Sequence, residues 1–372
     1  MNNNQSIIIE KLKQLSLSCH KFLSLHYLGE YKYPIEGYFA LYRGAKDYDL
    51  YGMLDAVYIL YTIGELEKFT SRQSRENWAN LILECQDERG WFSYRNLRGH
   101  PKEHATAYAI GALRLLEVDK NERYLHKVKR IHELQDLLES KEKTIKWIKR
   151  MGFEFSLKKN WGWHYIWRGS HIGGGVPAVI HMLENVIPQW WSKNFSLDLW
   201  FNCLFDWLDA HINPKTGFWQ RAFWNVFLKK PTIIDLGGAA HFYWIYEARK
   251  RSFLYPKQLI YSTISLQKEN GFYKGEKPWC IDLDANFCII RSYNQLNEKD
   301  RREVRDLVDR SIYLNFISSI KLMTEHEIDS IYSNTHELPG ALIALIESSK
   351  LNEFYAELFN NWKHPLDVVA WL

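Results

Sequence analysis

Six stretches of the chain are apolar on nearly every side and rich in small residues. Each runs for about 12 residues and begins at an aspartate or a histidine: Asp49, His104, His171, Asp235, Asp282 and His336. Such runs predict helices that are buried on both sides. Their starts are 55, 67, 64, 47 and 54 residues apart, which is the length of a helical hairpin with its loops.

Charged, amphipathic segments lie between these runs, for example at 127–150 and 297–314, and they predict outer helices with one face in water. The sequence shows no sustained alternation of apolar and polar residues that would predict strands. We therefore expect an all-α chain whose six hairpins close into a single (α/α)6 toroid over residues 1–372, with an inner and an outer ring of helices.

The turns before the inner helices repeat a glycine beside an aromatic residue, at 85–95, 160–169, 213–224 and 267–279. Glycine adopts positive φ without strain, and the aromatic ring can anchor the turn. The glycine-dense stretch 169–177 lacks the lysine of a phosphate-binding loop. It predicts close packing of helices instead.

The aromatic content and the net charge limit the kinds of ligand that we expect. The 16 Trp, 22 Tyr and 19 Phe exceed what packing requires, and such rings stack on sugar faces or stabilise cations. The net charge is +4 with bases and acids interleaved, so we expect no nucleic-acid partner and a small-molecule substrate, an isoprenoid or a sugar.

Five cysteines without a CxxC pair favour a reducing, cytoplasmic compartment. No run of 18 apolar residues occurs, so we expect no transmembrane segment, and the first residues do not resemble a secretory signal.

The segment 85–116, CQDERGWFSYRNLRGHPKEHATAYAIGALRLL, resembles the repeat shared by terpenoid cyclases and protein prenyltransferase β-subunits. In that repeat, a turn with Gln, Gly and an aromatic residue precedes an inner helix of Thr-Ala-Tyr-Ala character. The resemblance implies the toroid more than a particular chemistry.

The segment DLDANFCIIRSY at 282–293 resembles the DxDD motif of class II terpenoid cyclases. That resemblance makes Asp284 the proton donor, with Asp282 and His336 orienting it, although Ala285 replaces the third aspartate. The same positions can be compared with the zinc site of protein prenyltransferases, where an Asp-x-Cys pair and a later His bind the metal. That comparison gives Asp282, Asp284 and His336 as the alternative zinc ligands. The site would bind zinc weakly, because Asp replaces the Cys ligand. We expect no cofactor, with a divalent metal as the alternative.

The helix starts would line a central pit. In addition to Asp282, Asp284 and His336, the residues expected to line this pit are Asp49, His104, His171 and Asp235. Aspartate is also a good N-cap, and a histidine at a helix N-terminus is favoured in its neutral form. The expected aromatic wall is Trp91, Trp161, Trp163, Trp219, Tyr273 and Trp279, and the expected anion-binding residues are Arg43, Arg168 and Arg221.

Three functions are open. The first is a terpenoid-cyclase-like enzyme that cyclises an isoprenoid by acid initiation at an aspartate in an aromatic pit. The second is a carbohydrate-active toroid, a hydrolase or lyase on an acidic sugar, using paired Asp and His residues such as Asp49 with Asp235 or Asp235 with Asp284. The third is a ligand-binding toroid that has lost its chemistry, which the replacement by Ala285 favours.

Overall fold

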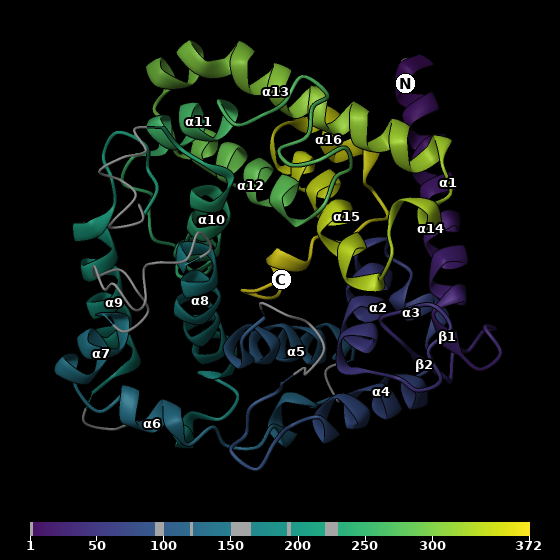
Figure 1. The fold of residues 1–372 in the computed structure, drawn as a ribbon, viewed down its shortest axis with the longest axis horizontal. Coiled ribbons are helices and arrows are strands. Elements are labelled where there is room, and N and C mark those ends of the chain that lie inside the picture. Colours follow the sequence, from purple (N-terminus) through teal and green to yellow (C-terminus); the bar gives the residue numbers. More distant parts are fainter. Residues whose placement is uncertain (1–2, 94–99, 120–121, 150–164, 192–194, 220–229) are drawn as a thin grey trace. The chain divides into compact units, whose positions relative to one another are not determined.

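The computed structural model describes residues 3–93, 100–119, 122–149, 165–191, 195–219 and 230–372. Most of these residues are helical, and their β-structure is limited to a two-stranded sheet and isolated bridges, so the expected all-α class is confirmed. The chain divides into two compact units. The first unit comprises Met1–Ile82 and Thr263–Val368, and the second comprises Leu83–Ser262 and Val369–Leu372 (Figure 1).

The first unit begins with a long helix and a short hairpin and ends with helices from the C-terminal third of the chain. Its strands pair antiparallel, with Tyr27 opposite Phe39. Its elements are α1 (Asn3–Leu25), β1 (Tyr27–Leu28), β2 (Tyr38–Phe39), α2 (Leu50–Thr62), α3 (Leu66–Phe69), most of α4 (Arg72–Glu84), α12 (Cys280–Gln295), α13 (Glu298–Glu325), α14 (Ile328–Ile331), α15 (Leu338–Glu347) and α16 (Glu353–Leu358).

The second unit contains the middle helices of the chain together with its last four residues. Its elements are α5 (Lys102–Leu116), α6 (Glu133–Leu137), α7 (Lys141–Ile148), α8 (Tyr165–Leu183), α9 (Leu197–His211), α10 (Ile233–Ala248) and most of α11 (Pro256–Ile264).

The six predicted apolar helices are present, three in each unit. In the first unit α15 packs between α2 and α12, and in the second unit α8 packs between α5 and α10 (Figure 1). Nearly all side chains of α2 and α5 are buried, as expected of helices that neighbours cover on both sides.

Small residues allow this close packing. A Cβ atom added to Gly340 of α15 would lie 2.6 Å from Cα of Cys280 on α12. A Cβ atom added to Gly175 of α8 would lie 2.9 Å from the carbonyl oxygen of Glu103 on α5. The expected role of the stretch 169–177 in helix packing is confirmed.

One helix begins earlier than its pattern predicts. The apolar run suggests a start at His171, but α8 begins at Tyr165 and passes through three consecutive glycines and Pro177. Glycine and proline disfavour a helix interior, and the packing of α8 between α5 and α10 outweighs that preference.

Two of the repeated turns share one hydrogen-bond scheme. Gln86 Nε2 donates to the carbonyl oxygens of Gly90 (2.6 Å) and Lys129 (3.0 Å) in the second unit. Gln267 Nε2 donates in the same way to Gly271 and Ser311, both at 3.0 Å, in the first unit. In these two turns a glutamine is therefore bonded to a residue 43 or 44 positions later in the chain.

The turn glycines have the expected backbone. Gly90, Gly217 and Gly271 have φ of 86°, 72° and 91°. The turn at 160–169 lies mostly outside the described residues. Among the helices that the structure describes, none is both long enough and apolar enough to cross a bilayer.

The close contact of α15 with α12 predicts that Gly340→Ala destabilises the protein by about 2 kcal/mol, the usual cost of overpacking, although alanine favours helices. Urea unfolding measures the change. Gly275→Ala is the matched control, because a Cβ there meets open space and only the φ of 72° is unfavourable. A Gly340→Ala protein as stable as the wild type would contradict this packing.

Candidate active site

The first turn of α12 brings the two aspartates of the predicted acid motif together. Asp282 caps the helix: its Oδ2 accepts from the backbone N–H of Trp279 at 3.1 Å. Its Oδ1 accepts from the N–H of Tyr273 at 3.2 Å and from Asn315 Nδ2 at 2.8 Å. Burial raises the pKa of Asp282, while these N–H donors act in the opposite direction. Asp282 is thus fixed by three donors.

Asp284 is different, although it lies only two residues further along the helix. It is 1% exposed, and its Oδ1 has no hydrogen-bond partner among the described residues. Burial and, to a lesser extent, the charge of Asp282 raise the pKa of Asp284 well above that of an ordinary aspartate. A raised pKa favours the protonated form of the Asp284 carboxyl, which is the form that a general acid requires. Ala285, where the resembled motif has a third aspartate, is fully buried.

His336 lies in a short helical turn, Thr335–Glu337, directly before α15. Its Nδ1 is 2.9 Å from Oδ1 of Asp55, a fully buried residue of α2. The hydroxyl of Thr335 donates to the other oxygen of Asp55 at 2.7 Å. Sequence reasoning missed Asp55. The available signal was a single carboxylate inside the otherwise apolar run 50–60.

In the second unit, the two predicted histidines stack on each other. The rings of His104 on α5 and His171 on α8 are 4.7 Å apart and nearly parallel, at 11°. Two histidines that the pattern did not identify extend the cluster. His100 lies edge-on to His104 at 4.5 Å, and His241 of α10 lies 4.6 Å from His171.

Hydrogen bonds engage two of the four histidines in this cluster, His104 and His241. The indole N–H of Trp371, which can only donate, is 2.7 Å from Nδ1 of His104. That nitrogen therefore carries no proton, and His104 is neutral. Nδ1 of His241 is 2.8 Å from the hydroxyl of Ser170, and burial lowers the pKa of His241 well below its usual value. Neutral histidines suit proton transfer.

The other predicted aspartates are helix caps. Asp49 accepts from the N–H groups of Gly52 (2.8 Å) and Leu41 (2.7 Å), and burial raises its pKa. Asp235 forms a capping box with Thr232 at the start of α10. These contacts explain both residues structurally and do not single out a catalytic carboxylate pair.

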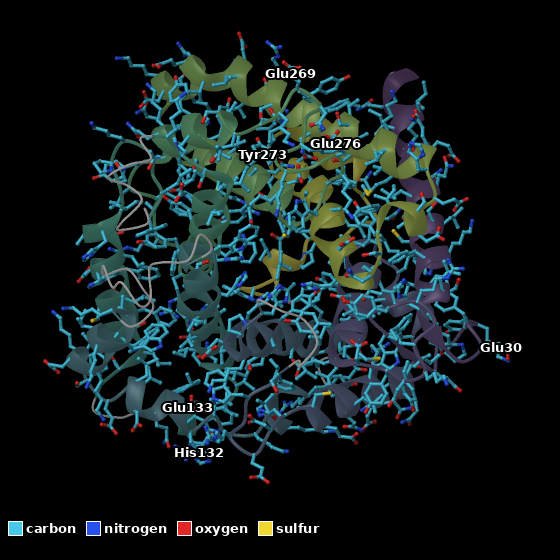
Figure 2. The ribbon with its side chains drawn as sticks, in the orientation of Figure 1. Glu30, His132, Glu133, Glu269, Tyr273 and Glu276 are labelled. Carbon is cyan, nitrogen blue, oxygen red and sulfur yellow. The ribbon has the colours of Figure 1, made fainter. Side chains whose placement is uncertain are left out.

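The described members of the predicted aromatic wall have different surroundings. Trp219 is 1% exposed and donates its indole N–H to the carbonyl oxygen of Leu208 at 2.8 Å. Tyr273 is buried, while Glu269 and Glu276 of the same turn are exposed (Figure 2). Trp279, immediately before α12, is half-buried, and the ammonium of Lys274 lies 4.3 Å from its ring centre. Trp161 and Trp163 lie outside the described residues.

Of the predicted anion-binding residues, the structure describes the side chain of Arg43 alone. It is 63% exposed and pairs with Asp329 at 3.3 Å, as an ordinary surface ion pair does. Arg221 and the side chain of Arg168 lie outside the described part of the chain.

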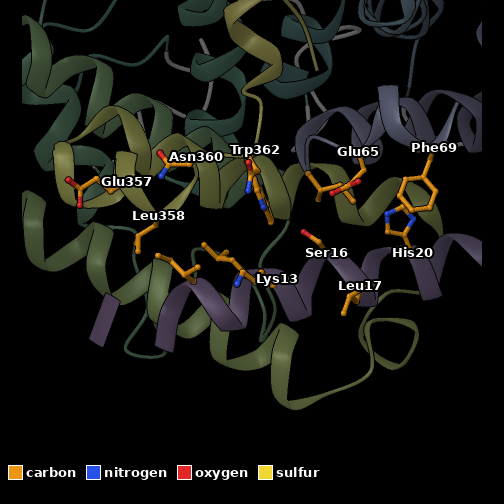
Figure 3. A pocket seen from close by; sticks show the side chains of 14 residues that line it. Lys13, Ser16, Leu17, His20, Glu65, Phe69, Glu357, Leu358, Asn360 and Trp362 are labelled. Atoms are coloured by element: carbon orange, nitrogen blue, oxygen red, sulfur yellow. The ribbon is translucent and has the colours of Figure 1, made fainter. Parts of the chain in front are cut away.

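Each unit also contains a cavity, and of the predicted site residues Trp91 alone lines one of the two. In the first unit, a cavity of about 450 Å³ lies between α1 and the segment around α16 and is lined by Lys13, Ser16, His20, Phe69 and Trp362 among others (Figure 3). In the second unit, a cavity of about 410 Å³ is lined by Trp91, Trp147, Glu103, Glu133 and Asp136 among others. Figure 2 places Glu133 at the start of α6.

The geometry gives little support to the alternative in which Asp282, Asp284 and His336 bind a metal ion. Both oxygens of Asp282 already accept hydrogen bonds from N–H groups, and Nδ1 of His336 faces Asp55. Burial raises the pKa of Asp284, which disfavours the ionised form that a metal ligand requires. Asp282, Asp284 and His336 therefore fit proton chemistry better than zinc.

No family model, curated protein or solved structure matches this chain. The interpretation of the site accordingly follows from its own geometry.

The burial of Asp284 predicts a cost in stability. Because burial raises the pKa of Asp284 in the native state, the unfolded chain releases this proton at lower pH, and the cost grows as the pH rises above the ordinary aspartate value of 3.8. We expect Asp284→Asn to raise the free energy of unfolding by about 2 kcal/mol at pH 7, and by much less at pH 4. Urea unfolding at both pH values checks this. The exposed Asp306→Asn is the control, and a destabilised Asp284→Asn protein would refute the argument.

A second buried carboxylate predicts the opposite pH dependence. Glu347 of α15 contacts Arg291 Nε at 2.7 Å and His364 Nε2 at 2.6 Å. Burial opposes its ionisation, but Arg291 and His364 outweigh burial and lower its pKa from 4.5 to about 2. Its contribution is complete above pH 4.5 and is lost as the pH falls toward 2.

We therefore expect Glu347→Gln to reduce the free energy of unfolding by about 3 kcal/mol at pH 7, because Arg291 loses its buried partner. Thermal unfolding from pH 7 down to pH 2 should show the two proteins converging in stability at low pH. A constant difference across this range would exclude the depressed pKa.

Proposed function

We propose that this protein is a terpenoid-cyclase-like enzyme in which Asp284 starts the cyclisation of an isoprenoid by donating a proton. The observation that carries the proposal is the buried carboxyl of Asp284, whose Oδ1 has no hydrogen-bond partner among the described residues and whose pKa is raised by burial. Keeping such a group costs stability, and proteins retain such costs mainly at functional sites.

The different hydrogen bonding of Asp282 and Asp284 on α12 supports this role. Asp282 is held by three N–H donors, so it fixes the start of the helix and contributes negative charge near Asp284. Asp284 then retains its proton until a substrate accepts it. Burial raises the pKa of Asp282 only to about 7, because its N–H donors oppose the shift, whereas Asp284 has no such donor on Oδ1. Asp284 is therefore the acid of the pair, without the third aspartate of the resembled motif.

Aromatic faces supply the second requirement, because a carbocation is stabilised by ring quadrupoles. Trp279 is half-buried immediately before α12, and its ring already attracts a cation, the ammonium of Lys274. An isoprenoid cation formed near the start of α12 would meet this ring. We expect no cofactor in the reaction.

We propose further that the two units together form one (α/α)6 toroid. Each unit holds three of the six predicted apolar helices, packed consecutively, and the Gln-Gly turn occurs with the same hydrogen bonds in both units. All five cysteines are free thiols, which favours the cytoplasm as the compartment.

The cavity of the second unit favours a second candidate function, binding or cleavage of a sugar. Trp91 and Trp147 offer ring faces, and Glu103, Glu133 and Asp136 offer acceptors for hydroxyl groups. Asp49 and Asp235 are helix caps, so a sugar-active site would draw its acids from this cavity.

The proposal predicts cyclisation with proton exchange. The full chain, supplied with geranylgeranyl diphosphate or squalene in D₂O, should release a cyclic isomer carrying one deuterium from solvent, since one proton adds and another leaves. Asp284→Asn should reduce turnover roughly a thousandfold. Mass spectrometry and NMR of the product measure both effects.

Asp306→Asn should leave turnover unchanged, because that side chain is exposed on α13. Thermal stabilisation by an unsaturated uronic oligosaccharide alone, lost in Trp147→Ala, would replace the cyclase by the sugar-active candidate. No stabilisation and no turnover with any of these compounds would favour the ligand-binding toroid without chemistry.

A further inference from the structure

We propose that His336 is a general base and that Asp55 is the residue that positions it. The proton that His336 would accept depends on the proposed function, whereas the hydrogen-bond arrangement does not. The observations are the 2.9 Å contact between His336 Nδ1 and Asp55 Oδ1 and the complete burial of Asp55.

The direction of this hydrogen bond is assigned from the chemistry of Asp55 as an ionised carboxylate. Its Oδ2 accepts from the hydroxyl of Thr335 at 2.7 Å, and a carboxylate can only accept. Nδ1 of His336 must therefore donate its proton to Oδ1. In the neutral ring the proton is then on Nδ1 and the lone pair is on Nε2. This tautomer can accept a proton at Nε2, as a general base does.

The ring is held in this orientation on two further sides. Tyr51 of α2 lies edge-on to the His336 ring, with centres 4.7 Å apart. The backbone N–H of His336 donates to Asn334 Oδ1 at 3.1 Å, and the N–H of Thr335 donates to the carbonyl oxygen of Leu41 at 3.0 Å. The His336 side chain nevertheless stays 22% exposed, so protons can exchange with water.

This arrangement assigns His336 a different role from the one the sequence suggested. With Nδ1 committed to Asp55, His336 is placed as the acceptor of a proton rather than as the group that orients Asp284. Acid and base then lie on helices of one unit: Asp284 on α12, and His336 at the start of α15, which packs against α12.

The step balances as follows. Asp284 has added a proton to the substrate and become a carboxylate, and the substrate has become a carbocation. Nε2 of His336 forms a bond to a hydrogen on the carbon next to the cation, and the electron pair of that C–H bond becomes the new C=C bond. The imidazolium pairs with the Asp55 carboxylate, releases its proton to water, and Asp284 regains a proton from water.

A test without substrate is ¹⁵N NMR of the full chain labelled at histidine. His336→Gln identifies the His336 signals by their loss. The wild type should show a protonated Nδ1 and a bare Nε2 at neutral pH. A protonated Nε2 in the neutral ring overturns the proposal, and this outcome needs no Asp55 variant to fold.

Asp55→Asn should change that tautomer, because an amide can donate to Nδ1. The rate at which diethyl pyrocarbonate acylates His336 Nε2, read by peptide mass spectrometry, should fall roughly tenfold, the factor for one hydrogen bond to a charged group. Asp329→Asn, a surface variant, should react as the wild type does. An unchanged rate in a folded Asp55→Asn protein overturns the positioning role.

The two proposals fail separately. If the isoprenoids are not cyclised but the tautomer and acylation results hold, then His336 is a base of another reaction. If Asp284→Asn abolishes cyclisation while Asp55→Asn leaves kcat unchanged, then Asp284 is supported as the acid and His336 is excluded as the base.

Discussion

The structure depends on how closely its apolar helices approach one another. In each unit a central helix, α15 or α8, lies between two others at contacts where a single added carbon would collide with the neighbouring backbone. Since interiors are packed at crystal-like density, such contacts leave no room for water. The polar groups on these helices must therefore find partners within the protein or remain unpaired at a cost.

The aspartates of these helices show both outcomes. Asp49, Asp235 and Asp282 accept hydrogen bonds from backbone N–H groups at helix starts, where a carboxylate compensates the unpaired donors. Asp284 is two residues beyond the cap and has passed these donors. The same residue type therefore changes from a structural cap to a buried acid within half a turn of helix.

The sequence predicts the helices better than the site. Five of the six apolar helices begin within about two residues of the predicted position, because helix starts carry both a polar cap and an apolar run. The sixth, α8, begins six residues early because packing outweighs its glycines. The turn glycines were predictable from their aromatic neighbours, and Asp284 from its motif.

The partners of the site residues were not predictable in the same way. Asp55 is 281 positions from His336, and Trp371 is 267 positions from His104. Periodicity reports which face of a helix is buried, but it carries no information about which distant chain segment covers that face. The only local signal is a polar residue inside an apolar run, such as Asp55 or His241. Such a residue indicates that a hydrogen-bond partner is needed, but it does not indicate which residue that partner is.

The helix pair that carries Asp284 is held at both ends by different means. Near their starts, α12 and α15 meet at the contact between Cys280 and Gly340. Near their ends, Arg291 of α12 and Glu347 of α15 form a buried ion pair. A buried ion pair adds little net stability compared with an apolar contact, but it specifies one arrangement, because any shift would leave a charge unpaired. With both ends fixed, the helices stay together around Asp284, and the burial that raises its pKa is maintained by contacts at the ends of the two helices.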